Sequence, residues 1–366
     1  MSEHALAGNS GWVPLLDLLR FLSILGVWAY HYGVSGPYGM AADSIALPWL
    51  APVARYGYLG VPTFFIISGF VIAYSAAGRT WSQFAVARFS RIYPTFVLCM
   101  SLTILVTFLT RGSSLEETLV QWAANLFIAA PRIGHAYADN AYWSLVLEVA
   151  FYAWVTALIA VRVFPQRIDT IVLVWFSITL TNELTIDSRW VERVFLTDYA
   201  GFFATGMMIH EIYKGRKDLL AKALLVLSSG VAVFNAIHNL GYASHTAGAS
   251  LGERLTIAAV CLLSVSAILA ATRVQRLPCP KLAIALGGIT YPFYLLHQQL
   301  GYDLLKYFGS EHDLPAVMFM FAMTLFGSWL IWRYFERNIQ HRIKHAIGFG
   351  TSRIPAISTT SPGRSG

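Results

Sequence analysis

The chain has 366 residues, of which 56% are hydrophobic and only 12% are charged, whereas soluble globular proteins carry about 25% charged residues. This composition excludes the ordinary soluble class and indicates an integral membrane protein. The formal net charge of +7 does not call for a nucleic-acid partner, because basic loops facing anionic lipid account for it. The three cysteines show no paired spacing and the histidines no metal-ligand spacing, so neither disulfides nor a metal site are predicted.

The first apolar segment, residues 13–35 (VPLLDLLRFLSILGVWAYHYGVS), is long enough to cross a bilayer as a helix, yet it contains Asp17, Arg20 and His31. Eleven positions separate Arg20 from His31, and at about 100° per residue this spacing returns both side chains to within about 20° of one helix face. Asp17 lies three residues before Arg20 and can pair with it, which lowers the cost of burying a guanidinium. Three ionisable side chains in one span predict that the span faces a polar interior enclosed by other helices.

Further apolar segments follow along the chain. We expect them to span the membrane over residues 58–76, 92–110, 141–161, 168–184, 199–213, 219–238, 255–272, 281–305 and 314–332. An additional stretch, residues 118–130, is too short to cross and is typical of an interfacial or re-entrant segment. The sequence therefore predicts an all-α, polytopic transmembrane helical bundle of about ten spans over residues 1–345, followed by a disordered cytoplasmic tail over residues 346–366.

The lysines and arginines predict the orientation of this bundle. An even number of spans puts both termini on one side, and the loops on that side carry 18 lysines and arginines against seven on the other. Because cytoplasmic loops are enriched in basic residues, both termini are expected in the cytoplasm. The segments 111–140 and 182–198 then face outward, and they are where we expect an extracytoplasmic substrate to be recognised.

In this topology, ionisable groups from three spans fall in the outer half of the membrane. Glu148 lies about 10 Å below the outer surface, at a depth similar to that of His31 and His297, with Arg20 nearer the cytoplasm. A histidine can accept and return a proton near neutral pH, and a neighbouring carboxylate can orient its ring. Two simpler explanations remain: a membrane histidine is often only a structural hydrogen-bonding group, and Glu148 could neutralise Arg20.

Two further features suggest chemistry. Arg88 and Arg91 lie three residues apart where the chain enters the third span from the cytoplasm, and two guanidinium forks on one helix face suit a phosphate. They could equally be ordinary positive-inside anchors. Ser68, in the segment ISGF, is a candidate nucleophile, but Ser and Gly69 are also typical of close helix packing, which we favour.

Five segments, taken together and in this order, resemble the membrane acyltransferase family 3, the O-acyltransferases of bacterial surface glycans. They are LRFLSILGVWAYHY, GVPTFFIISGFVI, FAVARFSRIYP, WSLVLEVAFY and ITYPFYLLH. The resemblance implies an enzyme of the bacterial inner membrane that moves an acyl group, acetyl above all, from cytoplasmic acyl-CoA to a saccharide hydroxyl beyond the membrane. The donor would be acetyl-CoA, the acceptor a cell-surface glycan or lipid-linked saccharide, and neither a metal nor a nucleic acid would take part.

The resemblance also implies roles for individual residues. His31 matches the essential histidine of the family and Arg20 its paired arginine, Glu148 falls on the glutamate of the Trp-Ser-Leu motif, and Arg88 and Arg91 match the Arg-x-x-Arg pair assigned to donor binding. On this hypothesis, His31 takes the proton of the acceptor hydroxyl while Glu148 orients or charges its ring. Arg20 would hold the donor or stabilise the developing oxyanion.

One matching residue has no such role, and one rival function stays open. His297 matches the histidine that ends the Tyr-Leu-Leu-His motif, for which the resemblance implies a supporting place near the substrate. A transporter or flippase that moves a lipid-linked sugar or an acyl donor without forming a bond would also need polar groups inside a helical bundle. A base-like histidine combined with a phosphate-binding pair favours the enzyme.

Overall fold

The computed structural model describes residues 13–35, 49–238, 250–274, 277–310 and 313–346, and this part of the chain contains helices and no strands. The long helices are α1 Pro14–Tyr30, α3 Gly60–Ala76, α4 Trp81–Arg111, α6 Trp143–Ala160, α7 Ile168–Thr181, α9 Ala200–Tyr213, α10 Leu219–His238, α12 Leu251–Ala271, α13 Pro280–Leu296 and α15 Leu314–Leu330. The shorter α-helices are α2 Ala51–Ala54, α5 Leu115–Leu126, α8 Arg189–Phe195, α14 Gln299–Tyr307 and α16 Arg337–Ala346. Short 3₁₀ and π turns, introduced below where they matter, connect them. The all-helical prediction is therefore confirmed.

Helix length and composition support a membrane protein. Six helical stretches of the described residues are long and apolar enough to cross a bilayer: Ala51–Ala76, Trp81–Arg111, Asn140–Ala160, Leu219–His238, Leu251–Ala271 and Leu314–Ile343. Each of the ten predicted spans corresponds to a helix, but the count of ten membrane crossings and the cytoplasmic termini stay predictions. The predicted tail, from residue 347 on, lies outside the described residues.

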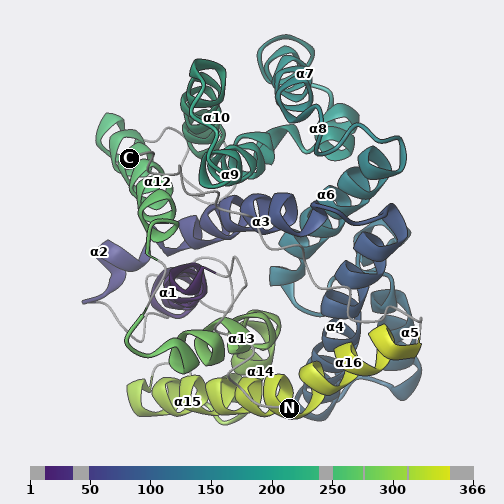
Figure 1. Ribbon diagram of the computed structural model, residues 1–366. Coiled ribbons are helices and arrows are strands. Elements are labelled where there is room, and N and C mark those ends of the chain that lie inside the picture. The colour runs from purple at the N-terminus through teal and green to yellow at the C-terminus, as the bar shows by residue number, and fades with distance from the viewer. Residues whose placement is uncertain (1–12, 36–48, 239–249, 275–276, 311–312, 347–366) are drawn as a thin grey trace.

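The helices surround α1. In Figure 1 this helix is seen nearly end-on, with α3 and α12 on one side and α13 and α15 on the other, while α4 and α6 close a further side. Helix α9 lies between α3 and α10. Because α1 is enclosed in this way, its polar side chains are directed to other helices, as the polar interior predicted from the sequence requires.

The shortest predicted span is an internal helix. Every residue of α9 from Ala200 to Glu211 is buried. Two glycines permit its contact with α3: a Cβ atom on Gly206 would lie 1.9 Å from the carbonyl oxygen of Ile66, and one on Gly69 would lie 2.1 Å from that of Phe203. Small residues let membrane helices approach closely, and here they bring two backbones into contact. The interpretation of Gly69 as a packing residue is confirmed.

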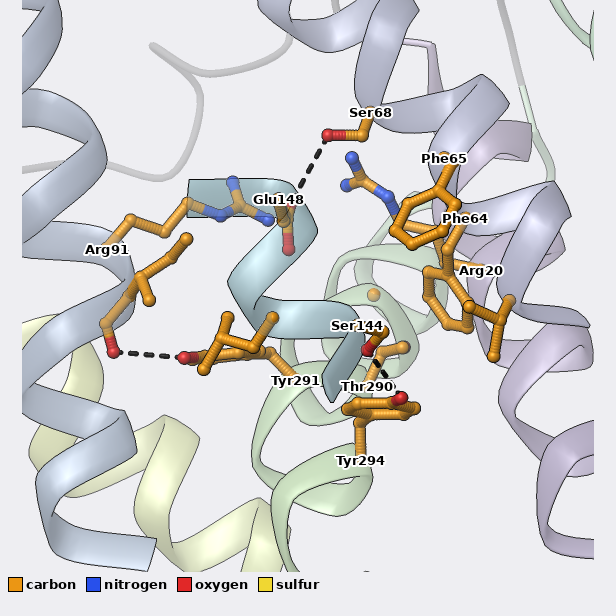
Figure 2. A pocket seen from close by; sticks show the side chains of 14 residues that line it. Arg20, Phe64, Phe65, Ser68, Arg91, Ser144, Glu148, Thr290, Tyr291 and Tyr294 are labelled. Atoms are coloured by element: carbon orange, nitrogen blue, oxygen red, sulfur yellow. Dashed lines mark hydrogen bonds between the residues drawn. The ribbon is translucent and has the colours of Figure 1, made fainter. Parts of the chain in front are cut away.

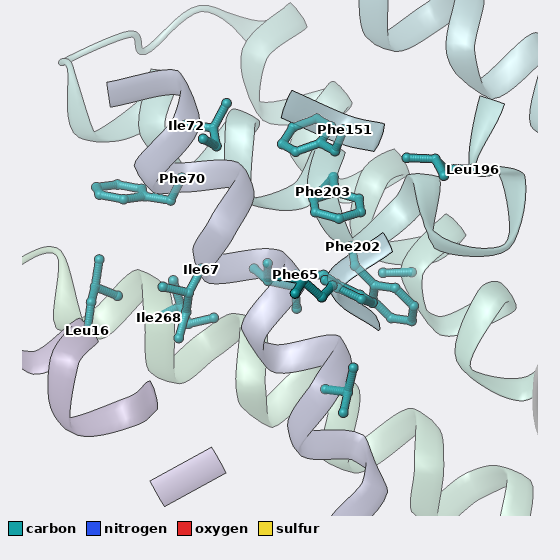
Figure 3. Packing of buried hydrophobic residues seen from close by; sticks show 14 of the residues in the cluster. Leu16, Phe65, Ile67, Phe70, Ile72, Phe151, Leu196, Phe202, Phe203 and Ile268 are labelled. Carbon is teal, nitrogen blue, oxygen red and sulfur yellow. The ribbon is translucent and has the colours of Figure 1, made fainter. Parts of the chain in front are cut away.

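Aromatic side chains fill the space around this contact. Phe203 of α9 stacks on Phe151 of α6, with ring centroids 4.2 Å apart, and it lies 4.8 Å from Phe65 of α3. Figure 3 shows these rings between the three helices, together with the aliphatic residues of α3. The cluster fixes α6 relative to α3 and α9, and thereby the position of Glu148, one turn before Phe151.

Two predicted boundaries differ from the structure. Helix α4 is continuous from Trp81, so Arg88 and Arg91 lie inside it rather than in a segment before the span. Its start is a capping box, in which Thr80 and Gln83 each satisfy the other's backbone N–H group. This signature, Thr-x-x-Gln, is visible in the sequence and marks the true beginning of the helix.

The ninth predicted span is broken. Helix α13 ends at Leu296 and α14 begins at Gln299, so His297 stands at the break rather than inside a helix. The carboxylate of Asp139, from a loop far away in the sequence, accepts a hydrogen bond from the Gln299 N–H at 2.8 Å. Because helix starts leave such N–H groups unsatisfied, this carboxylate stabilises the second start.

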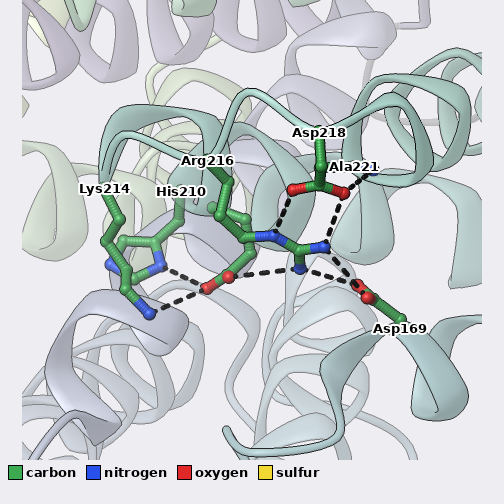
Figure 4. A network of polar contacts seen from close by, with 7 residues as sticks. Asp169, His210, Lys214, Arg216, Asp218 and Ala221 are labelled. Carbon is green, nitrogen blue, oxygen red and sulfur yellow. Dashed lines mark hydrogen bonds and ion pairs between the residues drawn. The ribbon is translucent and has the colours of Figure 1, made fainter.

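A polar network lies at the C-terminal end of α9. Arg216, in the turn between α9 and α10, donates to both carboxylate oxygens of Asp169 in α7, at 2.8 and 3.0 Å, and to Asp218, at 3.1 Å. It also lies 3.5 Å from Glu211 of α9. The hydrogen bonds from Arg216, with one from the Ala221 N–H, lower the pKa of Asp218 to about 2. The network, drawn in Figure 4, therefore stays ionised at physiological pH and ties together three helix ends.

Candidate functional site

A cavity of about 90 Å³ lies between α1, α3, α4, α6 and α13. Its polar lining residues are Arg20, Ser68, Arg91, Ser144, Glu148, Thr290, Tyr291 and Tyr294, and its apolar wall includes Phe64 and Phe65. Figure 2 shows these side chains converging from separate helices. A concave space on which polar groups converge from several helices has the character of a small-molecule site.

Glu148 occupies the middle of this cavity. Its Oε1 atom accepts a hydrogen bond from the Ser68 hydroxyl at 3.2 Å and a second one from the Tyr152 hydroxyl, one turn further along α6. Ser68 thus lines the cavity and bonds to the neighbouring helix α6, while the adjacent Gly69 makes the close contact with α9. The two neighbours on α3 face different surroundings because adjacent residues on a helix point about 100° apart.

Two guanidinium groups reach the same cavity. Arg20 from α1 and Arg91 from α4 approach Glu148 from either side in Figure 2, yet neither makes an ion pair with it among the described residues. Arg20 instead pairs with Asp17 at 3.4 Å, as the sequence predicts. With two arginines and one glutamate, the cavity carries a formal net charge of +1, which suits an anionic ligand.

Asp17 is held in place by a glycine on the facing helix. A Cβ atom on Gly287 of α13 would lie 2.5 Å from the Asp17 side chain, so only glycine lets the carboxylate pack against this backbone. The arrangement brings the negative charge close to Arg20 and leaves the other side of the guanidinium open to the cavity. Asp17 thus supports Arg20 and does not itself line the cavity.

Arg88 differs from Arg91. Its side chain is buried, with the guanidinium carbon 5.5 Å from the Phe84 ring centroid and 5.8 Å from that of Tyr152. It does not line the cavity, although its Nε atom is buried without a hydrogen-bond partner among the described residues. The two predicted forks are therefore not equivalent: Arg91 faces the cavity, and Arg88 packs beneath Tyr152.

His31 and His297 form a pair. Their ring centroids lie 5.2 Å apart, and each ring has one buried nitrogen, Nδ1 of His31 and Nε2 of His297, that finds no partner within the described chain. The Nδ1 atom of His297 donates to the carbonyl oxygen of Tyr294 at 2.7 Å, which leaves a lone pair on Nε2 of the neutral ring. Unsatisfied buried polar atoms are rare, and a substrate hydroxyl would satisfy these two.

Both histidines stand where a helix is interrupted. The chain leaves α1 after Tyr30 and continues from His31 as a π-helical turn to Ser35, and His297 lies at the break between α13 and α14. Such local departures from the α-helix are frequent at functional sites. Here the two interruptions bring the imidazole rings of His31 and His297 next to each other.

Two tyrosines lock this pair reciprocally. The hydroxyl of Tyr32 donates to the carbonyl oxygen of His297 at 2.7 Å, and the hydroxyl of Tyr302 donates to that of His31 at 2.8 Å. The two tyrosine rings lie 5.2 Å apart. Gly301 leaves the space for this arrangement, because a Cβ atom there would lie 1.9 Å from the Tyr32 hydroxyl.

The contact expected between Glu148 and His31 is absent from the described structure. Glu148 shares the cavity with Arg20, whereas His31 packs on His297 beyond Tyr294, whose ring lies 5.4 Å from that of His297. A similar count along each span therefore did not bring the two groups into contact, because depth along a helix does not fix the direction in which a side chain points.

Tyr294 joins the two groups. Its hydroxyl is 2.6 Å from the Ser144 hydroxyl and 2.9 Å from the carbonyl oxygen of Ala141, while its ring lines the cavity. Sequence reasoning missed Tyr294, Tyr152 and the two locking tyrosines, since it treated tyrosines as interface and wall residues. Tyr294 lies three residues before His297, and Tyr152 four residues after Glu148, so helical spacing from the two chosen residues would have found both.

The tyrosine lock makes a testable prediction. Replacing Tyr302 by Phe removes the hydrogen bond to the buried carbonyl of His31, which costs about 1–3 kcal/mol, and we expect activity to fall about tenfold or more because His31 loses its position. Turnover and thermal unfolding of the purified protein measure both effects. Tyr307→Phe, which changes an exposed ring on the same helix, is the matched control. Equal behaviour of the two variants would contradict a positioning role for Tyr302.

A third cluster has the spacing of a metal site. Glu183, Asp198 and His238 each offer one ligand atom, and these atoms lie within 4.8 Å of one another. Glu183 already accepts hydrogen bonds from Thr197, at 2.5 Å, and from Asn182, at 3.0 Å, and it lies 3.5 Å from the His238 ring. These protein contacts account for the cluster.

Comparison with known proteins identifies relatives. Residues 13–333 match the model of a family described as an acyltransferase domain. The exopolysaccharide production protein ExoZ of Rhizobium meliloti (strain 1021) is 26% identical over 282 residues, which cover 74% of this chain and 85% of ExoZ. The acyltransferase MdmB of Streptomyces mycarofaciens is 28% identical over 148 residues, covering 38% of this chain and 37% of MdmB. No solved structure gives a significant match.

Proposed function

The chain belongs to the acyltransferase family that its segments predicted, and from this premise we propose that it transfers an acetyl group from cytoplasmic acetyl-CoA to a hydroxyl of an extracytoplasmic polysaccharide. Family membership makes it a multi-pass membrane acyltransferase rather than a transporter that forms no bond. A polysaccharide acceptor is supported by the similarity to an exopolysaccharide production protein. We place the enzyme in the bacterial inner membrane, with its termini in the cytoplasm.

The observation that carries this proposal is a cavity with two arginines and one glutamate, one of whose lining residues, Tyr294, lies with its ring 5.4 Å from His297 of the histidine pair. In the proposed orientation, α4 begins at the cytoplasmic side, so a donor entering there meets Arg91, the one of the two predicted arginines that faces the cavity. Guanidinium groups bind phosphate through paired hydrogen bonds. The acyl arm then extends past Glu148 toward Tyr294, where His297 and His31 lie.

The transfer itself needs one base. The open nitrogen of His31 accepts the proton of the acceptor hydroxyl as its oxygen attacks the thioester carbonyl. The C–O bond forms, the C–S bond breaks, and the coenzyme A thiolate leaves and takes the proton back from His31. Arg20 faces the cavity with its charge oriented by Asp17, so it is suited to stabilise the oxyanion. Glu148 orders the cavity through Ser68 and Tyr152 instead of orienting His31.

Acetyl transfer can be measured directly. Protein in phosphatidylcholine nanodiscs is supplied with radiolabelled acetyl-CoA and with base-deacylated exopolysaccharide from cells that lack the gene. We expect label in the polysaccharide, and we expect Arg91→Gln to raise the KM for acetyl-CoA about 10-fold or more, as loss of a hydrogen bond to a charged group costs about 1.5–3 kcal/mol. Arg273→Gln, which removes an exposed charge at the end of α12, should leave KM unchanged.

Two results would contradict the proposal. Wild-type protein that binds acetyl-CoA without ever labelling a carbohydrate would remove the polysaccharide acceptor. An unchanged KM in Arg91→Gln, with normal protein levels, would make Arg91 a topological anchor instead of a donor contact.

A further inference from the structure

A second polar cavity lies on the other face of α6. It is an open cleft of about 720 Å³, and its walls come from α6, from the loop before it, from α8 and from the segment between α8 and α9. Trp143 and Leu147 of α6 line this cleft, whereas Ser144 and Glu148, one position further along, line the first cavity. The two spaces therefore lie at the same level on different faces of α6, which forms the wall between them.

Three arginines line the cleft without protein counter-ions. Arg189 and Arg193 lie four residues apart on α8, and Arg132 comes from the 3₁₀ turn η4, Ala130–Ile133, on the other wall. All three are exposed, and none makes an ion pair with a residue of the described chain. Cationic side chains that converge on one space without partners attract an anionic group.

Two carboxylic acids share the cleft. Glu192 lies between the two arginines of α8, and Asp198 of the turn η7, Thr197–Tyr199, is 7% exposed. Burial of Asp198, with the nearby charges of Glu192 and Glu183, raises the pKa of its carboxyl group. Because a raised pKa favours the neutral form of Asp198, positive charge dominates the cleft.

Aromatic rings form the floor. Trp143, 39% exposed, packs on Tyr199 with ring centroids 5.8 Å apart, and Tyr137 stands on the opposite wall. The face of a pyranose ring carries C–H groups that pack on such rings, and its hydroxyls donate to carboxylates. A phosphatidylglycerol headgroup would also use the arginines, but it has no ring face to pack on Trp143 and Tyr199. The combination therefore fits a sugar that bears a carboxylate.

We propose that this cleft binds an acidic sugar residue of the saccharide acceptor, with Arg189 and Arg193 contacting its carboxylate. The identification of this sugar as part of the acceptor rests on the proposed function. Since a helix with its side chains is about 10 Å wide, more than one pyranose ring, the acidic sugar and the sugar that is acylated are different residues of the same chain. The cleft thus selects a charged polysaccharide and sets which hydroxyl reaches the histidine pair.

Binding without donor tests this proposal independently of acyl transfer. The probes are a β-1,4-linked glucose tetrasaccharide with one glucuronic acid and the same compound with its carboxyl group reduced, titrated calorimetrically into full-length protein in phosphatidylcholine nanodiscs. We expect the acidic probe to bind more tightly, and we expect the double variant Arg189→Gln/Arg193→Gln to weaken its binding about tenfold and to abolish the preference. The double variant Arg167→Gln/Arg273→Gln, which removes two exposed arginines outside the cleft, is the charge-matched control.

The remaining outcomes are equally decisive. Equal affinity for the acidic and reduced probes, or an unchanged preference in Arg189→Gln/Arg193→Gln, would overturn the proposal. Loss of binding when nanodiscs contain phosphatidylglycerol would assign the arginines to a lipid headgroup and would also overturn it. Preferential binding of the acidic probe by a protein that transfers no acetyl group would leave the cleft intact and refute only the proposed reaction.

Discussion

Replacing His31 by Gln should lower kcat for acyl transfer by about 10²–10⁴-fold, the usual contribution of a general base. Gln keeps a polar side chain of similar length but cannot accept a proton at neutral pH. Donor binding should be unchanged, because Arg91 and Arg20 lie in the cavity on the other side of Tyr294. Single-turnover kinetics with acetyl-CoA, combined with equilibrium binding of the donor, separate these two effects.

The partner histidine provides the control for this experiment. In His297 one ring nitrogen is already used by the Tyr294 carbonyl, so His297→Gln is expected to slow transfer less than His31→Gln does. A larger loss in His297→Gln would reverse the assignment and make His297 the base. Activity within twofold of wild type in His31→Gln would exclude His31 from proton transfer.

The second large effect concerns stability. We expect Gly206→Ala to destabilise the protein by at least about 1–3 kcal/mol, the usual cost of overpacking, because the new methyl group would meet the backbone carbonyl of Ile66 at 1.9 Å. A backbone atom cannot rotate away as a side chain can, so α9 must move from α3. Thermal unfolding in detergent measures the loss of stability. We also expect activity to fall, because α3 forms part of the cavity wall.

Gly230 of α10 offers a matched control. No heavy atom lies within 4 Å of a Cβ atom built there, so Gly230→Ala should be neutral or should stabilise the helix by up to about 1 kcal/mol. If Gly206→Ala and Gly230→Ala unfold at the same temperature, the close contact between α9 and α3 is not a determinant of stability.

Much of the fold follows from local patterns, and the failures have physical causes. Apolar length located each long helix, including α9, whose burial explains why it can be so short. The break at His297 was invisible because the groups that stabilise it, Asp139 and Tyr32, are distant in the sequence. A helix start satisfied from another part of the chain leaves no signal near the break itself.

The candidate site was predicted as a set of residues but not as an arrangement. Arg20 and Asp17 pair as their spacing predicts, because an i,i+3 contact is local. The expected contact between Glu148 and His31 failed because depth along a span does not fix the direction in which a side chain points: Glu148 turns into the cavity, and His31 packs on His297. Tertiary contacts, unlike helical periodicity, depend on how the helices are rotated and placed relative to one another.

The reciprocal tyrosine bonds have a consequence for biosynthesis. They join positions 265 and 271 residues apart, so α1 emerges from the ribosome long before its partners exist. Helix α1 is not among the six stretches that qualify for insertion by length and apolarity, since it carries its polar side chains within a short apolar run. A nascent chain that ends after α12 would hold an unprotected first helix, and it should be a preferred target for membrane quality-control proteases until the last helices arrive.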